Sequence, residues 1–317
     1  MADIVAIDIG GTHARFALAT FGPGGAITLD SEVRLRTSEH DGLEAAWREY
    51  AARAGPLPPA AGIAIASPVT GDLLKMTNNK WSVRQSQIDA LLGIDHHVLL
   101  NDFGAVAHAV ANLDAQWLDH LCGPPEPLPT NGTISIIGPG TGLGVAQLVR
   151  DEGRYRVQAT EGGHIGFAPV DAFEDALLAH LRARHGRVSV ERVVSGPALP
   201  DICRIILDDP DAELDQKALW SDGLDGTDRA AAAAIDRFCL ALGSVAGDIA
   251  LAHGSSAIVI AGGVGLRLRE HLARPGFGAR IVAKGRYEAM LAAMPVKLIT
   301  YPEPGLYGAA AAWRAAR

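Results

Sequence analysis

Asn101 and Asp102 place an amide beside a carboxylate where an apolar stretch ends, in the segment HHVLLNDFGAVAHAV. The run 98–100 predicts a buried strand, and apolar residues at helical spacing over 105–110 predict a helix. An Asp at such a junction is a preferred helix N-cap, because its carboxylate accepts backbone N–H groups. In open α/β sheets, ligands also bind beyond the carboxyl ends of strands. The pair is therefore either a cap or part of a ligand-binding, catalytic site.

Two glycine-rich turns point to phosphate chemistry. AIDIGGTHARFALA (6–19) and SIIGPGTGLGVAQLV (135–149) both run from an apolar strand through a Gly-Thr turn into a second strand. Glycine lets backbone N–H groups approach a ligand, and successive N–H groups form anion-binding nests. Thr12 and Thr141 add hydroxyl donors. One tight hairpin would need glycine for its conformation alone, but two turns of the same plan favour a grip on a polyphosphate from both sides.

Neither turn belongs to a dinucleotide-binding motif. GPGTGLG (138–144) leads into a strand pattern, whereas the Walker A loop and the dinucleotide fingerprint lead into a helix. Asp8 ends the first strand and is either a turn cap or a carboxylate that holds Mg²⁺ through water. Mg²⁺ prefers one or two carboxylates together with phosphate oxygens.

Further carboxylates and a histidine lie in the middle of the chain. In EGGHIGF, Glu161 and His164 flank two glycines that make a helical metal-binding pair improbable. This turn is either a polar loop or a hydroxyl-binding loop, since carboxylate and imidazole both accept from sugar hydroxyls. Glu191, in VSVERVVSG, is predicted as a solvated first-turn helix residue that follows Ser189.

The elements that must position these residues form an alternating α/β pattern. Strands are predicted over DIVAIDIG, ARFALAT, AITLDSEVRLRT, GIAIAS, AIVIAGG and VKLIT, and a hairpin over SPVTGDLLKMTNNKW. Helices are predicted over GLEAAWREYAARAG, over SVRQSQIDALLG with Ser82 as its N-cap, over 171–185, 196–208 and 227–253, and over GLYGAAAAWRAAR. The repeated strand-turn-strand plan predicts two related halves. Each half opens with a hairpin in a βββαβα order, so each sheet is mixed.

Composition limits the class of protein. The chain has 317 residues, 48% hydrophobic and 20% charged, which suits a globular protein of one or two domains. Its 28 basic and 36 acidic residues give a net charge of −8 with no basic run, so we expect no nucleic-acid partner. We expect no membrane segment, because no leader pattern and no apolar run of about 18 residues is seen. Cys122, Cys203 and Cys239 lack paired spacing, which fits the cytoplasm.

Taken together, the motifs resemble one family. DIGGTHAR, MTNNKW, LNDFGA, GPGTGLG, EGGHIGF, ERVVSGP and IAGGV occur in this order along nearly the whole chain. They resemble the bacterial ATP-dependent glucokinases of the proteobacterial type, within the sugar kinase/actin/Hsp70-like superfamily. The resemblance implies a two-domain, actin-like (ribonuclease H-like) α/β ATPase fold with mixed sheets flanked by helices and a cleft between the domains. The implied small domain is 1–112 plus 302–317, the large domain is 113–301, and the assembly is a homodimer.

The resemblance also implies residue roles. The first phosphate loop contains Ile7, Asp8, Ile9, Gly10, Gly11 and Thr12, the second contains Gly138, Gly140, Thr141 and Gly142, and the adenosine-side loop contains Gly262 and Gly263. The implied sugar ligands are Asn78, Asn101, Asp102, Glu161, His164 and Glu191. Asp102 matches the catalytic base. For Glu191 the resemblance replaces the solvated-helix interpretation that its spacing favours.

The implied reaction is transfer of the γ-phosphoryl group of ATP to the 6-hydroxyl of glucose, with Mg²⁺. GHIGFAPVDAFEDALLAHL contains no Cys, so we expect no structural zinc of the kind found in the related repressor/kinase group. The first phosphate loop begins at residue 7, so we expect no DNA-binding helix-turn-helix before it. The alternatives are a kinase for another hexose, such as mannose or fructose, and a catalytically silent sugar sensor. Asp8, Thr12 and Asp102 are intact, which argues against the sensor.

Overall fold

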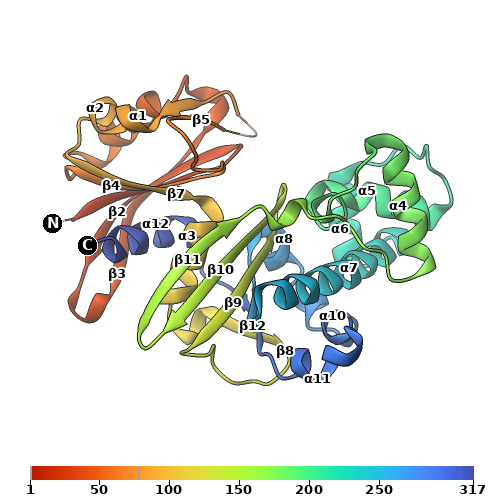
Figure 1. Cartoon of the computed structure of the whole chain (residues 1–317). Coiled ribbons are helices and arrows are strands. Elements are labelled where there is room, and N and C mark those ends of the chain that lie inside the picture. The colour runs from red at the N-terminus through yellow and green to blue at the C-terminus, as the bar shows by residue number, and fades with distance from the viewer. Residues whose placement is uncertain (1, 77–78) are drawn as a thin grey trace. The chain divides into compact units, whose positions relative to one another are not determined.

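The computed structural model describes residues 2–76 and 79–317. The described residues form two compact units (Figure 1). Unit 1 comprises residues 1–113 and 301–317, and unit 2 comprises residues 114–300. The last helix of the chain therefore belongs with the N-terminal unit.

Unit 1 is built on a mixed sheet. Its strands are β1 (Ile4–Ile9), β2 (His13–Phe21), β3 (Ile27–Arg36), β4 (Ala60–Ile65), β5 (Leu73–Lys75), β6 (Ser82–Arg84) and β7 (His96–Asn101). Its helices are α1 (Leu43–Ala54), α2 (Ile88–Leu92), α3 (Asp102–Asn112) and α12 (Pro304–Ala315). The main sheet has the order β3-β2-β1-β4-β7, with β1, β4 and β7 parallel and the β1–β2–β3 meander antiparallel. Strands β5 and β6 form a separate hairpin.

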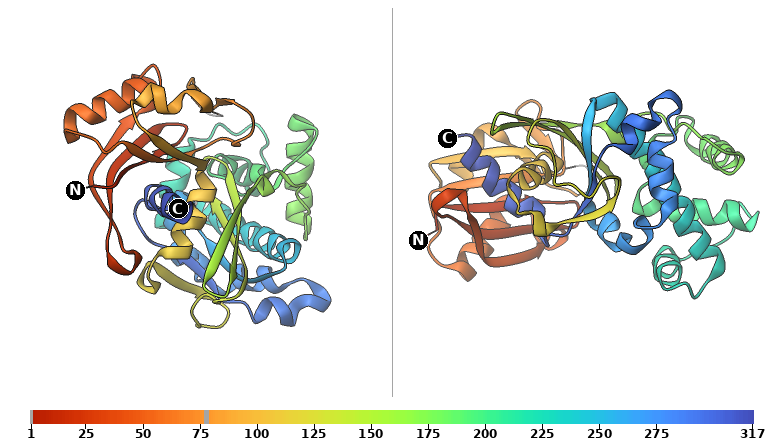
Figure 2. Two further views of the ribbon diagram at one scale, coloured as in Figure 1. Left: turned by 60° about the vertical axis from the view of Figure 1, so that its left-hand side comes forward. Right: turned by 90° about the horizontal axis from the view of Figure 1, so that it is seen from below.

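Helices cover both faces of this sheet. In α1, Leu43, Ala46, Trp47 and Tyr50 are buried at the spacing of one helix face, and they pack with alternate residues of β1 such as Ile7. The intervening residues of β1 face the other way and pack with α12. Figure 2 shows α3 and α12 lying side by side. This alternation directs the side chain of each strand residue to one helical layer or the other.

Unit 2 contains a second mixed sheet. Its strands are β8 (Leu118–Cys122), β9 (Gly132–Pro139), β10 (Leu143–Asp151), β11 (Arg154–Thr160), β12 (Ser255–Ile260) and β13 (Val296–Ile299). Its helices are α4 (Ala172–His185), α5 (Leu199–Leu207), α6 (Gln216–Asp225), α7 (Arg229–His253), α8 (Gly262–Arg267), α9 (Arg269–Leu272), α10 (Pro275–Val282) and α11 (Glu288–Ala292). The strand order is β11-β10-β9-β12-β13-β8. Helix α7 crosses the middle of the helical layer and packs against β9, β12 and α10 (Figure 1).

The two sheets repeat one plan. In each, a three-strand antiparallel meander leads from its first strand to two parallel strands: β3-β2-β1-β4-β7 in unit 1 corresponds to β11-β10-β9-β12-β13 in unit 2. Both first hairpins enclose three turn residues, 10–12 and 140–142. The two related halves and the mixed sheets predicted from the sequence are therefore present. Strand β8 is an addition at the edge of the second sheet.

One local expectation is wrong, and one helix was missed. Ser82 does not cap a helix, because it begins strand β6, and the helix starts only at Ile88. Helix α6 was not predicted. Helix α7 is long and apolar enough to cross a membrane by length and composition alone. Of its most apolar window, 67% is buried within the protein, which is the usual position of a core helix.

Candidate active site

The parallel strands of unit 1 bring two of the predicted motifs to one edge of the sheet. Ile9 pairs with Ile65, and Ile65 pairs with Asn101, so β1, β4 and β7 end level with one another. The turn 10–12 continues from β1, and helix α3 continues from β7. Carboxyl ends of adjacent parallel strands are the usual place for a ligand in such sheets.

Asn101, not Asp102, caps helix α3. The side-chain oxygen of Asn101 accepts the N–H groups of Phe103 and Gly104, at 2.9 and 3.1 Å. Asp102 is the first residue of the helix, and its Oδ1 accepts the N–H of Phe103 at 2.8 Å. Of the alternatives that the sequence left open for the pair, the N-cap is therefore Asn101. Because a neighbour supplies the cap, the carboxylate at position 102 is not needed to begin the helix.

The first glycine turn is held by residues that the sequence did not single out. The N–H of Gly10 bonds to the carbonyl of His13 at 2.9 Å. Thr37 donates its hydroxyl to the carbonyl of Gly11 at 2.9 Å, and the side-chain amide of Asn79 donates to the carbonyl of Gly10 at 3.1 Å. With the turn's carbonyls occupied by these donors and the N–H of Gly10 bonded to His13, the N–H groups of Gly11 and Thr12 are the ones that could bind an anion. Asn78, predicted as a sugar ligand, lies outside the described residues.

Asp8 lies at the centre of a partly buried charged group. Its carboxylate accepts from Arg15 at 3.1 Å, and Arg15 also approaches Glu303 at 2.9 Å. A Cβ on Gly305, in the first turn of α12, would lie only 2.7 Å from the Asp8 carboxylate, so this glycine makes room for it. Burial raises the pKa of the Asp8 carboxyl above its ordinary value, and the Arg15 guanidinium opposes that rise.

In unit 2 the segment that contains the second turn is in contact with the segment predicted to lie on the adenosine side. The N–H of Ala261 donates to the carbonyl of Ile137 at 2.8 Å, which places the start of α8 beside the end of β9. Gly262 has φ +78°, and a Cβ there would lie 2.5 Å from the carbonyl oxygen of Pro139. Glycine at 262 is thus required by its conformation and by the close approach. The predicted residues Gly138, Gly140, Thr141, Gly142, Gly262 and Gly263 therefore lie at one edge of this sheet.

A further segment supports the second turn. The N–H of Gly196 donates to the carbonyl of Gly140 at 2.7 Å, and the Gly196 carbonyl accepts from the indole of Trp220 and the amide of Gln216, at 3.0 and 3.1 Å. The turn is thereby fixed from α6, a helix that the sequence did not predict. Gly196 lies in the motif ERVVSGP and could be noticed from the sequence. Trp220 lies in no motif, so its contact with the turn could not be predicted.

Three of the predicted sugar ligands lie on adjoining segments of unit 2. Residues 162–164 form a short 3-10 turn, and the side chains of Glu161 and His164 are 61% and 57% exposed, 3.9 Å apart. The N–H of Val190 donates to the carbonyl of Ile165 at 2.9 Å, so the segment carrying Glu191 runs beside this turn. Exposed carboxylate and imidazole groups on neighbouring segments suit a ligand with several hydroxyls.

Glu191 is not a solvated helix residue. It lies in a 3-10 turn (residues 190–192), is partly buried, and its Oε2 accepts the N–H of Leu143 at 2.9 Å. Leu143 follows directly after the second glycine turn. The structure therefore connects this carboxylate to the turn, which agrees with a role in the site and not with the interpretation from spacing.

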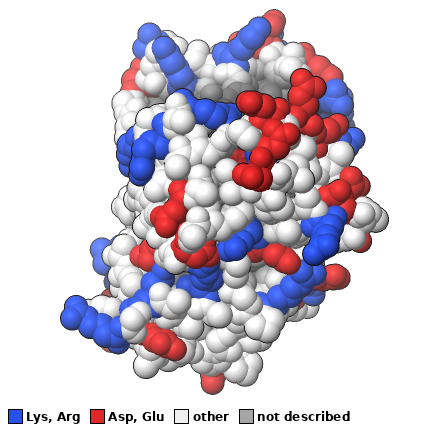
Figure 3. All heavy atoms as spheres, turned by 90° about the vertical axis from the view of Figure 1, so that its right-hand side faces the viewer, with Lys and Arg blue, Asp and Glu red and all other residues white. Residues whose placement is uncertain are grey.

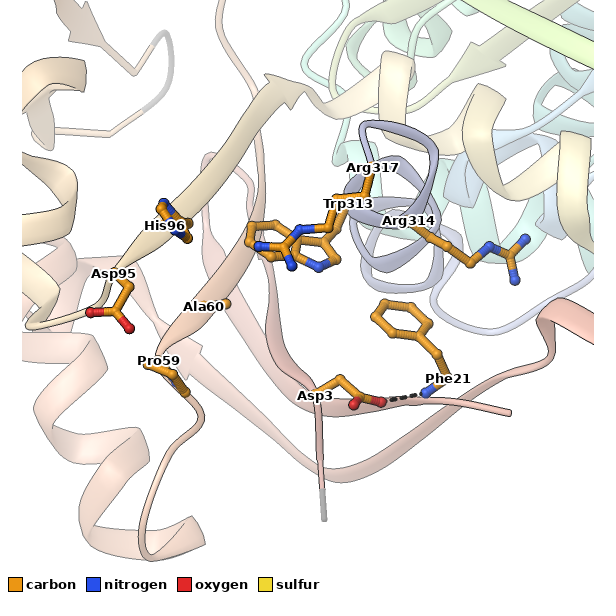
Figure 4. Close-up of a pocket in the computed structure, with 9 residues that line it drawn as sticks. All are labelled: Asp3, Phe21, Pro59, Ala60, Asp95, His96, Trp313, Arg314 and Arg317. Atoms are coloured by element: carbon orange, nitrogen blue, oxygen red, sulfur yellow. Dashed lines mark hydrogen bonds between the residues drawn. The ribbon is translucent and has the colours of Figure 1, made fainter. Parts of the chain in front are cut away.

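Other features of the surface do not compete with this site. A hollow of about 500 Å³ in unit 1, lined among others by Asp3, His96 and Trp313, lies at the opposite ends of β1, β4 and β7 (Figure 4). Among residues 2–76 and 79–317, no group of three or more His, Cys, Asp or Glu side chains is arranged to hold a metal ion. The face shown in Figure 3 carries both basic and acidic side chains, with acidic side chains gathered in the upper right of the view.

Comparison with solved structures defines the class of protein. The crystal structure of a glucokinase from an Antarctic psychrotroph matches with a TM-score of 0.86, is 31% identical, and covers 99% of both chains. That of a ROK family glucokinase from Streptomyces griseus, in complex with glucose and AMPPNP, has a TM-score of 0.62 over 97% of both chains and, at 20% identity, shows the fold alone. The chain is a sugar kinase-like protein of the actin-like ATPase fold, as its motifs predicted.

Sequence comparison gives the family. The glucokinase family model matches residues 5–316. The glucokinase of Zymomonas mobilis is 55% identical over 315 residues, which are 98% of this chain and 97% of that protein. The chain belongs to the glucokinase family, and the resemblance drawn from its motifs is confirmed.

Proposed function

We propose that this protein transfers the γ-phosphoryl group of ATP to the 6-hydroxyl of glucose, giving glucose 6-phosphate and ADP, and that Asp102 is the general base. Membership of the glucokinase family supports the reaction. The observation that supports the base is the division of roles between neighbours: Asn101 is the N-cap of α3, so a carboxylate at position 102, at the carboxyl end of β7, is not required as the cap. A carboxylate there would take the hydroxyl proton as the new O–P bond forms.

Asn101 would contribute its amide nitrogen to the sugar. Its oxygen already accepts two backbone N–H groups, and its Nδ2 is 3.4 Å from the carbonyl of Ser67. Nδ2 is therefore the atom suited to donate to a sugar hydroxyl. Glu161, His164 and Glu191 would hold the other hydroxyls, with Asn78 as a further ligand. Several directed hydrogen bonds fix the acceptor oxygen, and phosphoryl transfer depends mainly on such positioning.

The glycine turns would hold ATP. Backbone N–H groups of residues 11–12 and 141–142, with the exposed hydroxyl-bearing residues Thr12 and Thr141, suit phosphate oxygens. Gly262, packed against Pro139 before the second turn, and Gly263, which follows it, would approach the adenosine. Because these groups are fixed before the substrate arrives, they stabilise developing charge without reorganisation.

Asp8 would hold Mg²⁺ through water. Its carboxylate is 14% exposed and paired with Arg15, which suits an outer-sphere contact better than direct ligation. The metal, when bound with ATP, neutralises phosphate charge. The ion pair with Arg15 would keep Asp8 ionised and fixed in orientation despite its burial.

Substrate specificity is the experiment that tests this proposal. A coupled assay with glucose, mannose, fructose and N-acetylglucosamine should show ATP-dependent turnover with a clear preference for glucose. Turnover with mannose or fructose at least equal to that with glucose would indicate a different hexose kinase. Binding of sugar with no turnover of any would indicate a sensor. We also propose that the protein is a cytoplasmic homodimer, which light scattering of the purified protein would test.

A further inference from the structure

We infer that Gly142, in the second glycine turn, is a positioning residue for the sugar, because its missing side chain lets Glu191 reach the backbone of the turn. This inference rests on the proposed function, in which Glu191 is a sugar ligand. In that function the turn binds the phosphates of ATP. The inference adds that one of its residues, Gly142, also affects sugar binding.

The contacts of Gly142 single out Glu191. A Cβ at position 142 would lie 2.4 Å from Oε2 of Glu191 and 3.2 Å from its Cδ, and the three nearest heavy atoms all belong to this one side chain. The φ of Gly142 is outside the left-handed range, so its backbone conformation is open to other residues. The reason for glycine at this position is therefore the space that Glu191 occupies.

The N–H of Leu143 fixes the Glu191 carboxylate in the space beside Gly142. It donates to Oε2 of Glu191 at 2.9 Å, so one carboxylate oxygen is fixed by the backbone that follows the turn. Oε1 is then oriented and is the oxygen that would accept from a sugar hydroxyl. A hydrogen bond between a backbone N–H and a carboxylate is stronger than one between neutral groups.

The turn that contains Glu161 and His164, the second segment proposed to bind sugar, packs on Leu143. A Cβ on Gly163, between Glu161 and His164, would lie 2.2 Å from the carbonyl oxygen of Leu143. Leu143 thus fixes Glu191 through its N–H and abuts the EGGH turn through its carbonyl. The turn that would grip phosphate and the segments that would bind sugar form one packed group, so a change of shape in the turn alters the sugar ligands.

A pair of alanine substitutions in one turn tests the inference. Calorimetric binding of glucose without nucleotide should weaken about 10- to 100-fold in Gly142→Ala, the loss expected when a charge-assisted hydrogen bond is broken. Gly140→Ala is the matched control. Among the described residues, no heavy atom lies within 4 Å of a Cβ at 140, so the glucose Kd should stay within about twofold while ATP binding changes. Equal glucose affinities of the two variants would overturn the inference.

A double-mutant cycle separates positioning from a general structural effect. Glu191→Ala removes the side chain that Gly142→Ala would displace. In the Glu191→Ala background, the second substitution should therefore cause no further loss of kcat/KM for glucose and should restore any fall in thermal midpoint seen in Gly142→Ala alone. Additive losses would overturn the inference. A native protein that neither binds nor phosphorylates glucose would instead overturn the proposed function on which it rests.

Discussion

Asn101 and Asp102 show how neighbouring residues can divide two tasks that sequence alone assigns to one. The amide oxygen of Asn101 accepts two N–H groups at the start of α3, and Oδ1 of Asp102 accepts the N–H of Phe103, the residue beside it. Asn and Asp are comparable caps, so the pattern LND permits either arrangement. The choice depends on the backbone conformation of β7's last residue, which lies in the extended region.

Asp102→Asn tests the general base. The substitution keeps the size of the side chain and leaves the Asn101 cap in place, but it removes the proton acceptor. We expect kcat for glucose phosphorylation to fall about 10²- to 10⁴-fold, with little change in thermal midpoint. The matched control, Asn101→Asp, keeps a cap and the base and should mainly raise the KM for glucose. Near-normal kcat in a folded Asp102→Asn protein would contradict the assignment.

Metal removal tests the role of Asp8 and the expected lack of zinc. Treatment with EDTA should abolish activity, and Mg²⁺ alone should restore it in full, because ATP phosphates need charge neutralisation. Asp8→Asn should raise the Mg²⁺ concentration needed for half-maximal activity. Restoration by zinc but not by Mg²⁺ would count against Glu161 and His164 as sugar ligands.

Residue roles could be predicted only where a local motif carried them. The glycine turns, Asp8 and the Asn-Asp pair were visible because each follows an apolar strand. Thr37 and Asn79 were not, since they act by donating to carbonyls of a turn far away in the sequence. Glu191 was misread from its own spacing, because its partner, the N–H of Leu143, lies 48 positions earlier.

At the scale of elements, strands were easier to predict than helix limits. Runs of apolar residues predicted β1, β4, β12 and β13, which are buried. Helix α6 was not predicted because its sequence, QKALWSDGLD, contains a glycine and two Asp residues, which have low helix propensity. Gly223 is needed there, since a Cβ would lie 2.8 Å from the carbonyl of Ala231 in α7. Tertiary packing thus overrides a weak helix propensity.

The close approach of α12 to α3 gives a prediction for these elements. A Cβ on Gly308 would lie 1.8 Å from the carbonyl oxygen of Ala105. Alanine gains about 1 kcal/mol over glycine in a helix, but overpacking against a backbone atom costs about 1–3 kcal/mol or more. Gly308→Ala should therefore lower the free energy of unfolding of unit 1. It should also lower kcat, because displacing α3 moves its first residue, Asp102.

Gly42→Ala is the control for that substitution. Gly42 has an extended φ of 171°, and among the described residues no heavy atom lies within 4 Å of a Cβ there. The denaturant midpoint and kcat of the Gly42→Ala variant should remain close to those of the native protein. If Gly308→Ala behaved like Gly42→Ala, the two helices would not be packed as closely as the structure shows.

At the scale of the whole molecule, the C-terminal segment 301–317 belongs to unit 1 together with residues 1–113. Helix α12 packs against β1, β4 and α3, although nearly two hundred residues of unit 2 separate it from them in the sequence. The repeated strand-turn-strand pattern predicted two halves. That α12 completes unit 1 was implied by the family resemblance, because an Ala-rich helix gives no local sign of which sheet it covers.

Each hydrophobic cluster described lies within one unit, and this separation gives a last prediction. Phe16 stacks on Tyr50 in a cluster of unit 1, with ring centroids 5.1 Å apart, and Phe238 packs edge-on to Trp220 in unit 2, at 5.5 Å. Replacing a buried Phe by Ala costs about 3–5 kcal/mol. Phe16→Ala should therefore reduce hydrogen-exchange protection about 10²- to 10⁴-fold in the amides of unit 1, and Phe238→Ala in those of unit 2.

The two variants serve as controls for each other, because each removes the same number of atoms from a different core. Hydrogen exchange followed by mass spectrometry assigns the loss of protection to peptides of residues 1–113 and 301–317 or to those of 114–300. Peptides of α12 should respond with unit 1, since Leu306 and Trp313 belong to a cluster of that unit. Equal loss in both sets after Phe16→Ala would mean that the chain unfolds as a single cooperative unit.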